Sequence, residues 1–202
     1  FLTACVSGIS FLLLFISKKT NRNKAYQFFQ IYFLCYLLSM SSAAFLGHAL
    51  QAYVPNEVKI IGWVFSTLGQ LFLALGTLQA LKNLLSKMWL NTIHFILISQ
   101  CLIFIFLMLH PSYSNFKIAQ LAASTVLIGI VLPLHIFNFF KTSSTGSRNI
   151  ILTIIYAIIP AFIYNNQISI SKWFNYHDIS HVLMSIFMLM MYYSIKKLSY
   201  KD

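Results

Sequence analysis

The stretch Leu90–His110, LNTIHFILISQCLIFIFLMLH, decides the fold class of this chain. It runs for 21 residues without Asp, Glu, Lys or Arg, and about 20 mostly apolar residues are enough for an α-helix to cross a membrane. The rest of the chain has the same character, since 59% of its 202 residues are hydrophobic and only 8% are charged. A water-soluble domain carries about 25% charged residues, so a soluble globular fold is excluded.

Six further apolar runs of similar length precede and follow this stretch. The seven runs are Phe1–Ile16, Tyr26–Leu50, Val58–Leu81, Leu90–His110, Ala119–Phe140, Ile150–Tyr164 and Ile179–Ile195. Short connections with no domain boundary predict a single domain over residues 1–202, an all-α integral membrane protein with a bundle of seven transmembrane helices. The first run ends in Lys18-Lys19 and lacks a basic leading segment and a small-residue cleavage site, so we expect a membrane span and not a signal peptide.

The 14 basic residues predict the direction of these helices. Eleven lie after the first, third, fifth and seventh runs, at one end of the predicted bundle: Lys18, Lys19, Arg22, Lys24, Lys82, Lys87, Lys141, Arg148, Lys196, Lys197 and Lys201. Lys59, Lys117 and Lys172 lie at the other end. Short cytoplasmic loops are enriched in Lys and Arg, so we expect the N-terminus outside and the C-terminus in the cytoplasm. The net charge of +11 therefore reflects orientation, and we expect no nucleic-acid partner.

Small residues recur along one face of the third run. They are Gly62, Ser66, Gly69, Gly76 and Ala80. Their spacings of three, four and seven residues return to the same helix face, and small residues let two membrane helices approach closely. Leu73 falls on the same face, so we expect a helix interface that is split into two patches.

Prolines and cysteines predict further features of the spans. Pro133 and Pro160 lie inside the fifth and sixth runs, where a proline removes a backbone hydrogen bond and kinks a helix. Cys5, Cys35 and Cys101 lie singly in three different runs without the spacing of a metal-binding pair. We expect all three thiols to be buried small apolar groups.

Six histidines are the main source of chemistry in this sequence. The predicted topology places His48, His110, His177 and His181 at the outer end, and His94 and His135 near the inner end. His177 and His181 are four residues apart, so on a helix they share a face and can bind one metal ion. Together with His48 they predict a three-histidine zinc site whose fourth position is open to water.

Three polar residues near this site are candidate catalytic groups. Ser41 lies seven residues before His48, which returns it to nearly the same helix face, where its hydroxyl can hydrogen-bond a water or a substrate carbonyl. Asp178 lies three residues before His181 and can orient the imidazole or transfer a proton. Glu57 is the other acid at the outer end and can take the same proton.

The segment HDISHVLM at positions 177–184 resembles the seventh helix of the CREST superfamily. This group of seven-helix membrane proteins includes the alkaline ceramidases and the progestin and adipoQ receptors. The resemblance implies a zinc ion held by three histidines, matched here by His48, His177 and His181, with a serine and an acid in support. It also implies hydrolysis of a lipid amide or ester, with a membrane lipid as substrate.

Two positions depart from the superfamily pattern. The family serine lies four residues before the histidine of the second helix, where this chain has Ala44, and Ser41 is its substitute one turn away. The family aspartate of the third helix has no counterpart in Val58–Leu81, and Glu57 is the nearest acid.

A second resemblance covers the same part of the chain. The residues WFN at positions 173–175, followed by Asp178 and His181, are similar to a family of bacterial membrane proteins related to this superfamily. In that comparison Asp178 and His181 matter more than His177. It implies a bacterial inner membrane protein with its site toward the periplasmic, outer face.

Other interpretations of these residues stay open. Seven helices with a polar pocket also suit a non-catalytic receptor or sensor for a lipid or small molecule. A haem electron carrier would pair His48 with His181 and His94 with His135. Ion transport is less favoured, because no acid or base lies in the middle of a run. HxxxH can also arise by chance, and we expect His94, His110 and His135 to be ordinary interfacial side chains.

Overall fold

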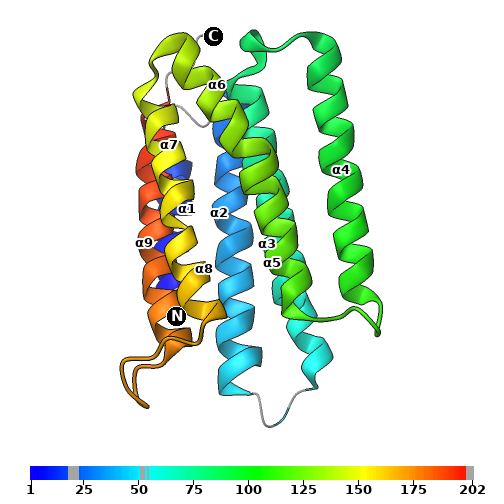
Figure 1. Ribbon diagram of the computed structural model, residues 1–202, viewed down its shortest axis with the longest axis vertical. Coiled ribbons are helices and arrows are strands. Elements are labelled where there is room, and N and C mark those ends of the chain that lie inside the picture. Colours follow the sequence, from blue (N-terminus) through cyan, green and yellow to red (C-terminus); the bar gives the residue numbers. More distant parts are fainter. Residues whose placement is uncertain (18–22, 51–52, 54, 199–202) are drawn as a thin grey trace.

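The structure, a computed structural model, describes residues 1–17, 23–50, 53 and 55–198, and at positions 47, 48, 56 and 57 it describes the backbone alone. These residues form helices joined by short connections and contain no β-strand. The α-helices are α1 (Leu2–Ile16), α2 (Lys24–Ser42), α3 (Ile60–Ala80), α4 (Lys87–Leu109), α5 (Phe116–Val126), α6 (Leu132–Thr142), α7 (Thr145–Tyr156), α8 (Ile158–Asn165) and α9 (Tyr176–Lys196) (Figure 1). Two π-helices, η1 (Ala43–Ala49) and η4 (Leu127–Val131), and two 3₁₀ turns, η2 (Asn56–Lys59) and η3 (Lys82–Leu84), complete them.

Six segments of the described chain are long and apolar enough to cross a membrane. They are Lys24–Leu46, Ile60–Ala80, Lys87–Leu109, Phe116–Thr142, Thr145–Asn165 and Tyr176–Lys196, and each coincides with a predicted run. The seventh run, α1, is apolar but has 15 residues. At about 1.5 Å per residue it is shorter than the roughly 30 Å apolar layer of a bilayer. The chain is an all-α, multi-pass membrane protein.

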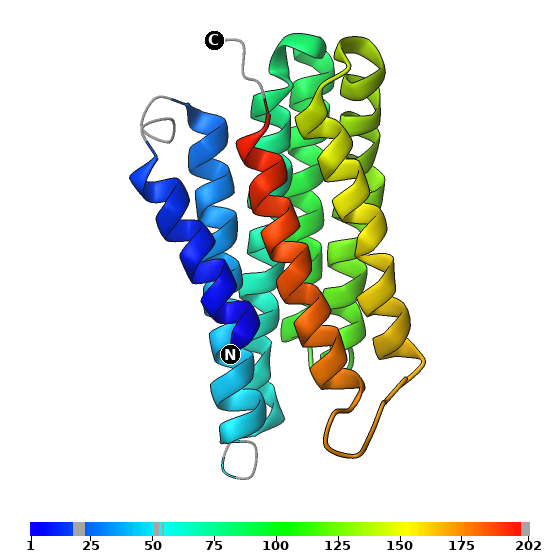
Figure 2. The same ribbon diagram turned by 90° about the vertical axis from the view of Figure 1, so that its left-hand side faces the viewer.

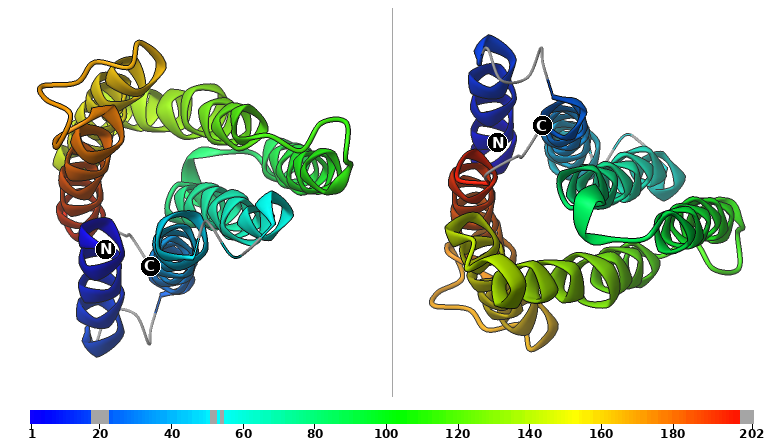
Figure 3. Two further views of the ribbon diagram at one scale, coloured as in Figure 1. Left: turned by 90° about the horizontal axis from the view of Figure 1, so that it is seen from below. Right: turned by 90° about the horizontal axis from the view of Figure 1, so that it is seen from above.

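Successive membrane-length segments run in alternate directions (Figures 1 and 2). α1, α3, α5 and α9 begin at the lower end in Figure 1, and α2, α4 and α7 begin at the upper end. α2 packs against α3, α1 packs against α2 and α9, and α7 and α8 pack against α9. The outer helices form an open arc around α2 and α3, and α4 lies at the edge of that arc (Figure 3).

The glycines of α3 face α2, as the spacing of its small residues predicts. A Cβ atom at Gly69 would lie 3.0 Å from the ring of Tyr36, and one at Gly76 would lie 2.6 Å from the ring of Phe29. Both rings are buried, and Leu73 between the two glycines is buried as well. These glycines therefore make room for aromatic side chains of the neighbouring helix.

Aromatic residues of α2 form the centre of the main hydrophobic core. The buried members are Tyr26, Phe29, Tyr32, Phe33 and Tyr36. They also reach α9, where the Tyr32 hydroxyl lies 3.4 Å from the sulfur of Met188 and the Phe33 ring lies 6.4 Å from the Tyr192 ring. α2 therefore connects α3 with α9 through large side chains.

Both predicted proline breaks are confirmed. Pro133 has no N–H to donate to the carbonyl of Gly129, and the helix widens into the π-helix η4 immediately before it. Pro160 likewise leaves the carbonyl of Tyr156 without its α-helical donor, and α7 ends at Tyr156. The crossing that contains Pro133 consequently consists of α5, η4 and α6, and the crossing that contains Pro160 consists of α7 and α8.

The prediction for the cysteines is correct for two of the three. Cys35 and Cys101 are buried, whereas Cys5 is exposed on α1. The difference arises because α1 packs only against α2 and α9 among its major neighbours, which leaves one face of the helix at the periphery. An apolar thiol on that face is compatible with contact to lipid.

Candidate functional site

A capping box at the start of α9 positions the two histidines of HxxxH. The side-chain oxygen of Asn175 accepts hydrogen bonds from the backbone N–H groups of His177, at 2.9 Å, and Asp178, at 3.4 Å. In return, the N–H of Asn175 donates to Oδ2 of Asp178 at 3.1 Å. This reciprocal pair fixes the first turn of the helix, so His177 and His181 lie on one face in consecutive turns.

The ring of His177 belongs to an aromatic cluster at the lower end of the bundle. Its centroid lies 4.1 Å from that of Tyr176 and 5.4 Å from that of Tyr164 on α8. Tyr164 contacts Phe116 of α5 at 5.4 Å, and Phe116 contacts Trp63 of α3 at 6.3 Å. The cluster holds the half-buried imidazole in a defined position and connects α9 with three other helices.

The start of α1 contacts both segments that carry the predicted zinc ligands. The Thr3 hydroxyl donates to the backbone carbonyl of His181 at 3.0 Å and lies 2.9 Å from the Ser185 hydroxyl. The ring of Phe1 packs edge-on against Phe45 of η1, with centroids 5.4 Å apart. α1 thus holds the beginning of α9 and the end of the second membrane crossing at the same end of the bundle.

The remaining predicted site residues lie on or after α2. Ser41 is half-buried in the last turn of α2, and the α-helix ends at Ser42. The following π-helix η1 is wider than an α-helix, so the α-helical spacing that relates Ser41 to His48 does not continue through this segment. The side chains of His48 and Glu57 lie outside the described residues.

Within the described part of the chain, no group of three or more His, Cys, Asp or Glu side chains is close enough to hold a metal ion. His177, Asp178 and His181 all lie on the first two turns of α9, but their side chains do not form such a group. The three-histidine zinc site, whose third ligand is His48, therefore stays a prediction.

Two of the other histidines match the interfacial interpretation. His110 is exposed at the lower end and accepts a hydrogen bond from the N–H of Ser112 at 3.3 Å. His94 is half-buried on α4, and its Nδ1 donates to the carbonyl of Leu90 at 2.7 Å. Both imidazoles form hydrogen bonds with the backbone of nearby residues close to a helix end, as amphipathic interfacial side chains do.

The prediction for His135 is wrong, because this side chain is fully buried. Its Nδ1 lies 2.9 Å from the Ser147 hydroxyl of α7, and its Nε2 lies 3.4 Å from the Thr77 hydroxyl of α3. The Asn138 amide donates to the same Ser147 hydroxyl, and Thr142 donates to the Asn138 side-chain oxygen at 3.0 Å. A polar network therefore joins α3, α6 and α7 near the upper end of the bundle.

The sequence contains a signal for this network, namely the spacing of the polar residues on α6. His135, Asn138 and Thr142 follow one another at intervals of three and four, which places them on one face of an otherwise apolar helix. Polar side chains on one face of a membrane helix point toward protein. Both ring nitrogens of His135 lie against hydroxyl groups of the protein. In this structure neither nitrogen is therefore placed to bind a haem iron together with His94.

Comparison with known proteins identifies the family of this chain. No curated protein and no solved structure matches the chain. The model of the family DUF6962, described as a family of unknown function, matches residues 1–200. The match covers nearly the whole chain, and the protein therefore belongs to the DUF6962 family.

Proposed function

We propose that the chain crosses the membrane seven times, with its N-terminus outside and its C-terminus in the cytoplasm. Three observations support this topology. α1 is a mostly apolar helix without a charged residue and packs along α2 and α9, and the segments alternate in direction. The upper end, where α2, α4 and α7 begin, is the end at which the sequence concentrates basic residues.

The function that the lower end supports best is zinc-dependent hydrolysis of a lipid amide or ester at the outer face of the membrane. The observation that carries this proposal is the pair His177 and His181, half-buried on one face of the first two turns of α9. Two imidazoles four residues apart on a helix are a common part of zinc sites. The π-helix that contains His48 reaches the same end of the bundle, and π-helical turns are frequent at functional sites.

The described residues fit such a site in part. His177 and His181 would be two nitrogen ligands, and His48 would be the third. Oδ2 of Asp178 is engaged by the N–H of Asn175, and the second oxygen of this carboxylate lies outside the capping box and can accept a proton. Ser41 would hydrogen-bond the substrate carbonyl. A bound zinc ion would supply Lewis-acid activation of water and carbonyl.

Metal analysis of the purified protein tests this proposal. We expect about one zinc per chain in the wild type, a large loss in His177→Ala and His181→Ala, and no loss in the control His110→Ala, which changes an exposed histidine at the same end. Turnover of a lipid amide and of the matching ester is measured on the same samples. Zinc content that is absent, or that is unchanged in His181→Ala, contradicts the proposal.

A non-catalytic receptor is the second candidate, and one observation favours it. The His177 ring is packed between tyrosine rings and the Asp178 carboxylate caps a helix, which are structural roles that a binding protein also needs. Retention of an unaltered lipid through purification, without turnover of amide or ester, would decide for this candidate.

A further inference from the structure

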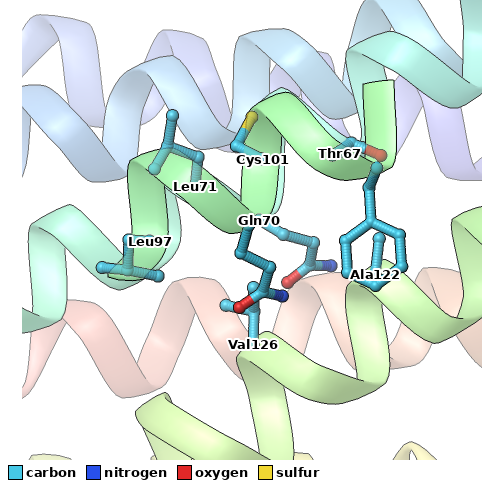
Figure 4. A pocket seen from close by; sticks show the side chains of 9 residues that line it. Thr67, Gln70, Leu71, Leu97, Cys101, Ala122 and Val126 are labelled. Carbon is cyan, nitrogen blue, oxygen red and sulfur yellow. The ribbon is translucent and has the colours of Figure 1, made fainter. Parts of the chain in front are cut away.

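A small pocket separates two hydrophobic clusters in the middle of the membrane-spanning region. The main core reaches it with Leu97 and Val126, and a second cluster at the lower end reaches it with Phe104 and Ala122. Helices α3, α4 and α5 enclose the pocket (Figure 4). Its empty volume is about 200 Å³ with its open side included, and the enclosed part has room for about one water-sized group.

Gln70 of α3 lines this pocket (Figure 4), and its side-chain oxygen has no hydrogen-bond partner within the described part of the chain. The side chain is 1% exposed. Its Nε2 donates to the Tyr36 hydroxyl of α2, and this bond aligns the amide. Oε1 is buried and has no hydrogen-bond partner among the described residues. A buried carbonyl without a donor is costly in the apolar interior of a membrane.

Two further polar side chains of the pocket wall donate hydrogen bonds within the protein. Nε2 of Gln100 donates to the Thr125 hydroxyl of α5, and the Thr67 hydroxyl donates to the carbonyl of Trp63 at 3.1 Å. Among the described residues of the pocket wall, Oε1 of Gln70 is the side-chain oxygen that is fully buried without a hydrogen-bond partner, and the surrounding wall is mostly apolar.

We propose that this pocket binds the hydroxyl group of a lipid-soluble alcohol, with its aliphatic chain directed out between α4 and the rest of the bundle. The hydroxyl donates to Oε1 of Gln70, and because a hydroxyl both donates and accepts, it serves the amide in either of its two orientations. The enclosed space has room for the hydroxyl, and the mostly apolar lining suits the first carbons of the chain. This site is independent of the proposed zinc site.

The position of α4 supports entry from the bilayer. α4 makes its main contacts with α3 and α5 alone, and only 17% of its most apolar stretch is buried, compared with 44% in α3. It also lies at the edge of the helical arc (Figure 3). An apolar molecule in the membrane therefore reaches the pocket beside α4 without crossing the main core.

Photolabelling of the full chain in lipid nanodiscs tests the proposal. The probe is a long-chain primary alcohol that carries a diazirine, and the labelled peptides are mapped by mass spectrometry. We expect label on the pocket-lining segments of α3, α4 and α5, competed by unlabelled decanol and not by decane. Gln70→Met, which removes the acceptor at nearly constant volume, reduces the label about tenfold, and Ala122→Leu, which fills the pocket, does the same.

Gln27→Met is the matched control, because it makes the same chemical change at an exposed glutamine of α2 that does not line the pocket. We expect labelling in this variant to stay near the wild-type level. Equal competition by decane, label that is unchanged in Gln70→Met and Ala122→Leu, label outside the pocket, or a loss in Gln27→Met as large as in Gln70→Met would each overturn the proposal.

Discussion

The ring of Phe29 occupies the space that Gly76 leaves on α3, since a Cβ atom there would lie 2.6 Å from the ring. Gly76→Ala therefore forces a fully buried aromatic side chain to move. We expect it to destabilise the protein by about 1–3 kcal/mol, measured as unfolding in detergent. Gly129→Ala is the control, because a Cβ at Gly129 meets nothing within 4 Å. Equal stability of the two variants would show that this contact does not limit packing.

Loss of the Ser147 hydroxyl leaves two buried groups without their partner. Both Nδ1 of His135 and the Asn138 amide are bonded to this one oxygen. We expect Ser147→Ala to lower stability by about 1–2 kcal/mol, measured by the same unfolding experiment. Ser124→Ala, at an exposed serine of α5, is expected to have little effect. A Ser147→Ala variant as stable as the wild type would contradict the structural role given to this network.

Variants of the two capping-box residues, Asn175 and Asp178, distinguish an effect on folding stability from an effect on lipid hydrolysis. Asn175→Ala removes the cap and is expected to cost about 1 kcal/mol of stability. Asp178→Asn keeps a side-chain oxygen that accepts from the N–H of Asn175 but removes the carboxylate as a proton acceptor. We expect it to be nearly as stable as the wild type yet to lose most lipid turnover. Equal turnover in wild type and Asp178→Asn would exclude a catalytic role for this carboxylate.

Labelling of engineered cysteines with a membrane-impermeant maleimide tests the proposed orientation. In a Cys5→Ala background, Ile170→Cys lies in the connection before α9, where the side chain is 76% exposed. Thr145→Cys lies at the exposed start of α7, at the opposite end. We expect the first cysteine to react in intact cells and the second only after permeabilisation. The reverse pattern would place the N-terminus inside.

The helices of the main bundle were predictable because their signals are local. An uninterrupted apolar run such as Leu90–His110 requires a helix in a membrane whatever its neighbours are. Pro133 and Pro160 act on the carbonyl four residues before them, so their breaks also follow from sequence position. The glycine spacing of α3 predicted a close interface, although the sequence does not reveal that aromatic rings of α2 fill it.

The environments of single side chains were harder to predict, because they depend on which helices meet. His135 was assigned by its depth along the span, yet its surroundings are set by Thr77 and Ser147 from two other helices. Asp178 was considered as a catalytic group, and its capping role was readable from Asn175 three residues earlier, as in a capping box. The π-helix after Ser42 has no obvious signal in the sequence, and it changes the face on which the following residues lie.

The hydrogen bond between Thr3 and Ser185, 182 positions apart in the chain, has a consequence for biosynthesis. A membrane protein is made from its N-terminus onward, so α1 is synthesised long before its partner α9 exists. Until then, the buried hydroxyls of α1 lack the protein surface that covers them in the finished bundle. Closure of the bundle therefore waits for the synthesis of α9, and a chain truncated before α9 would leave the Thr3 hydroxyl of α1 without its partners on that helix.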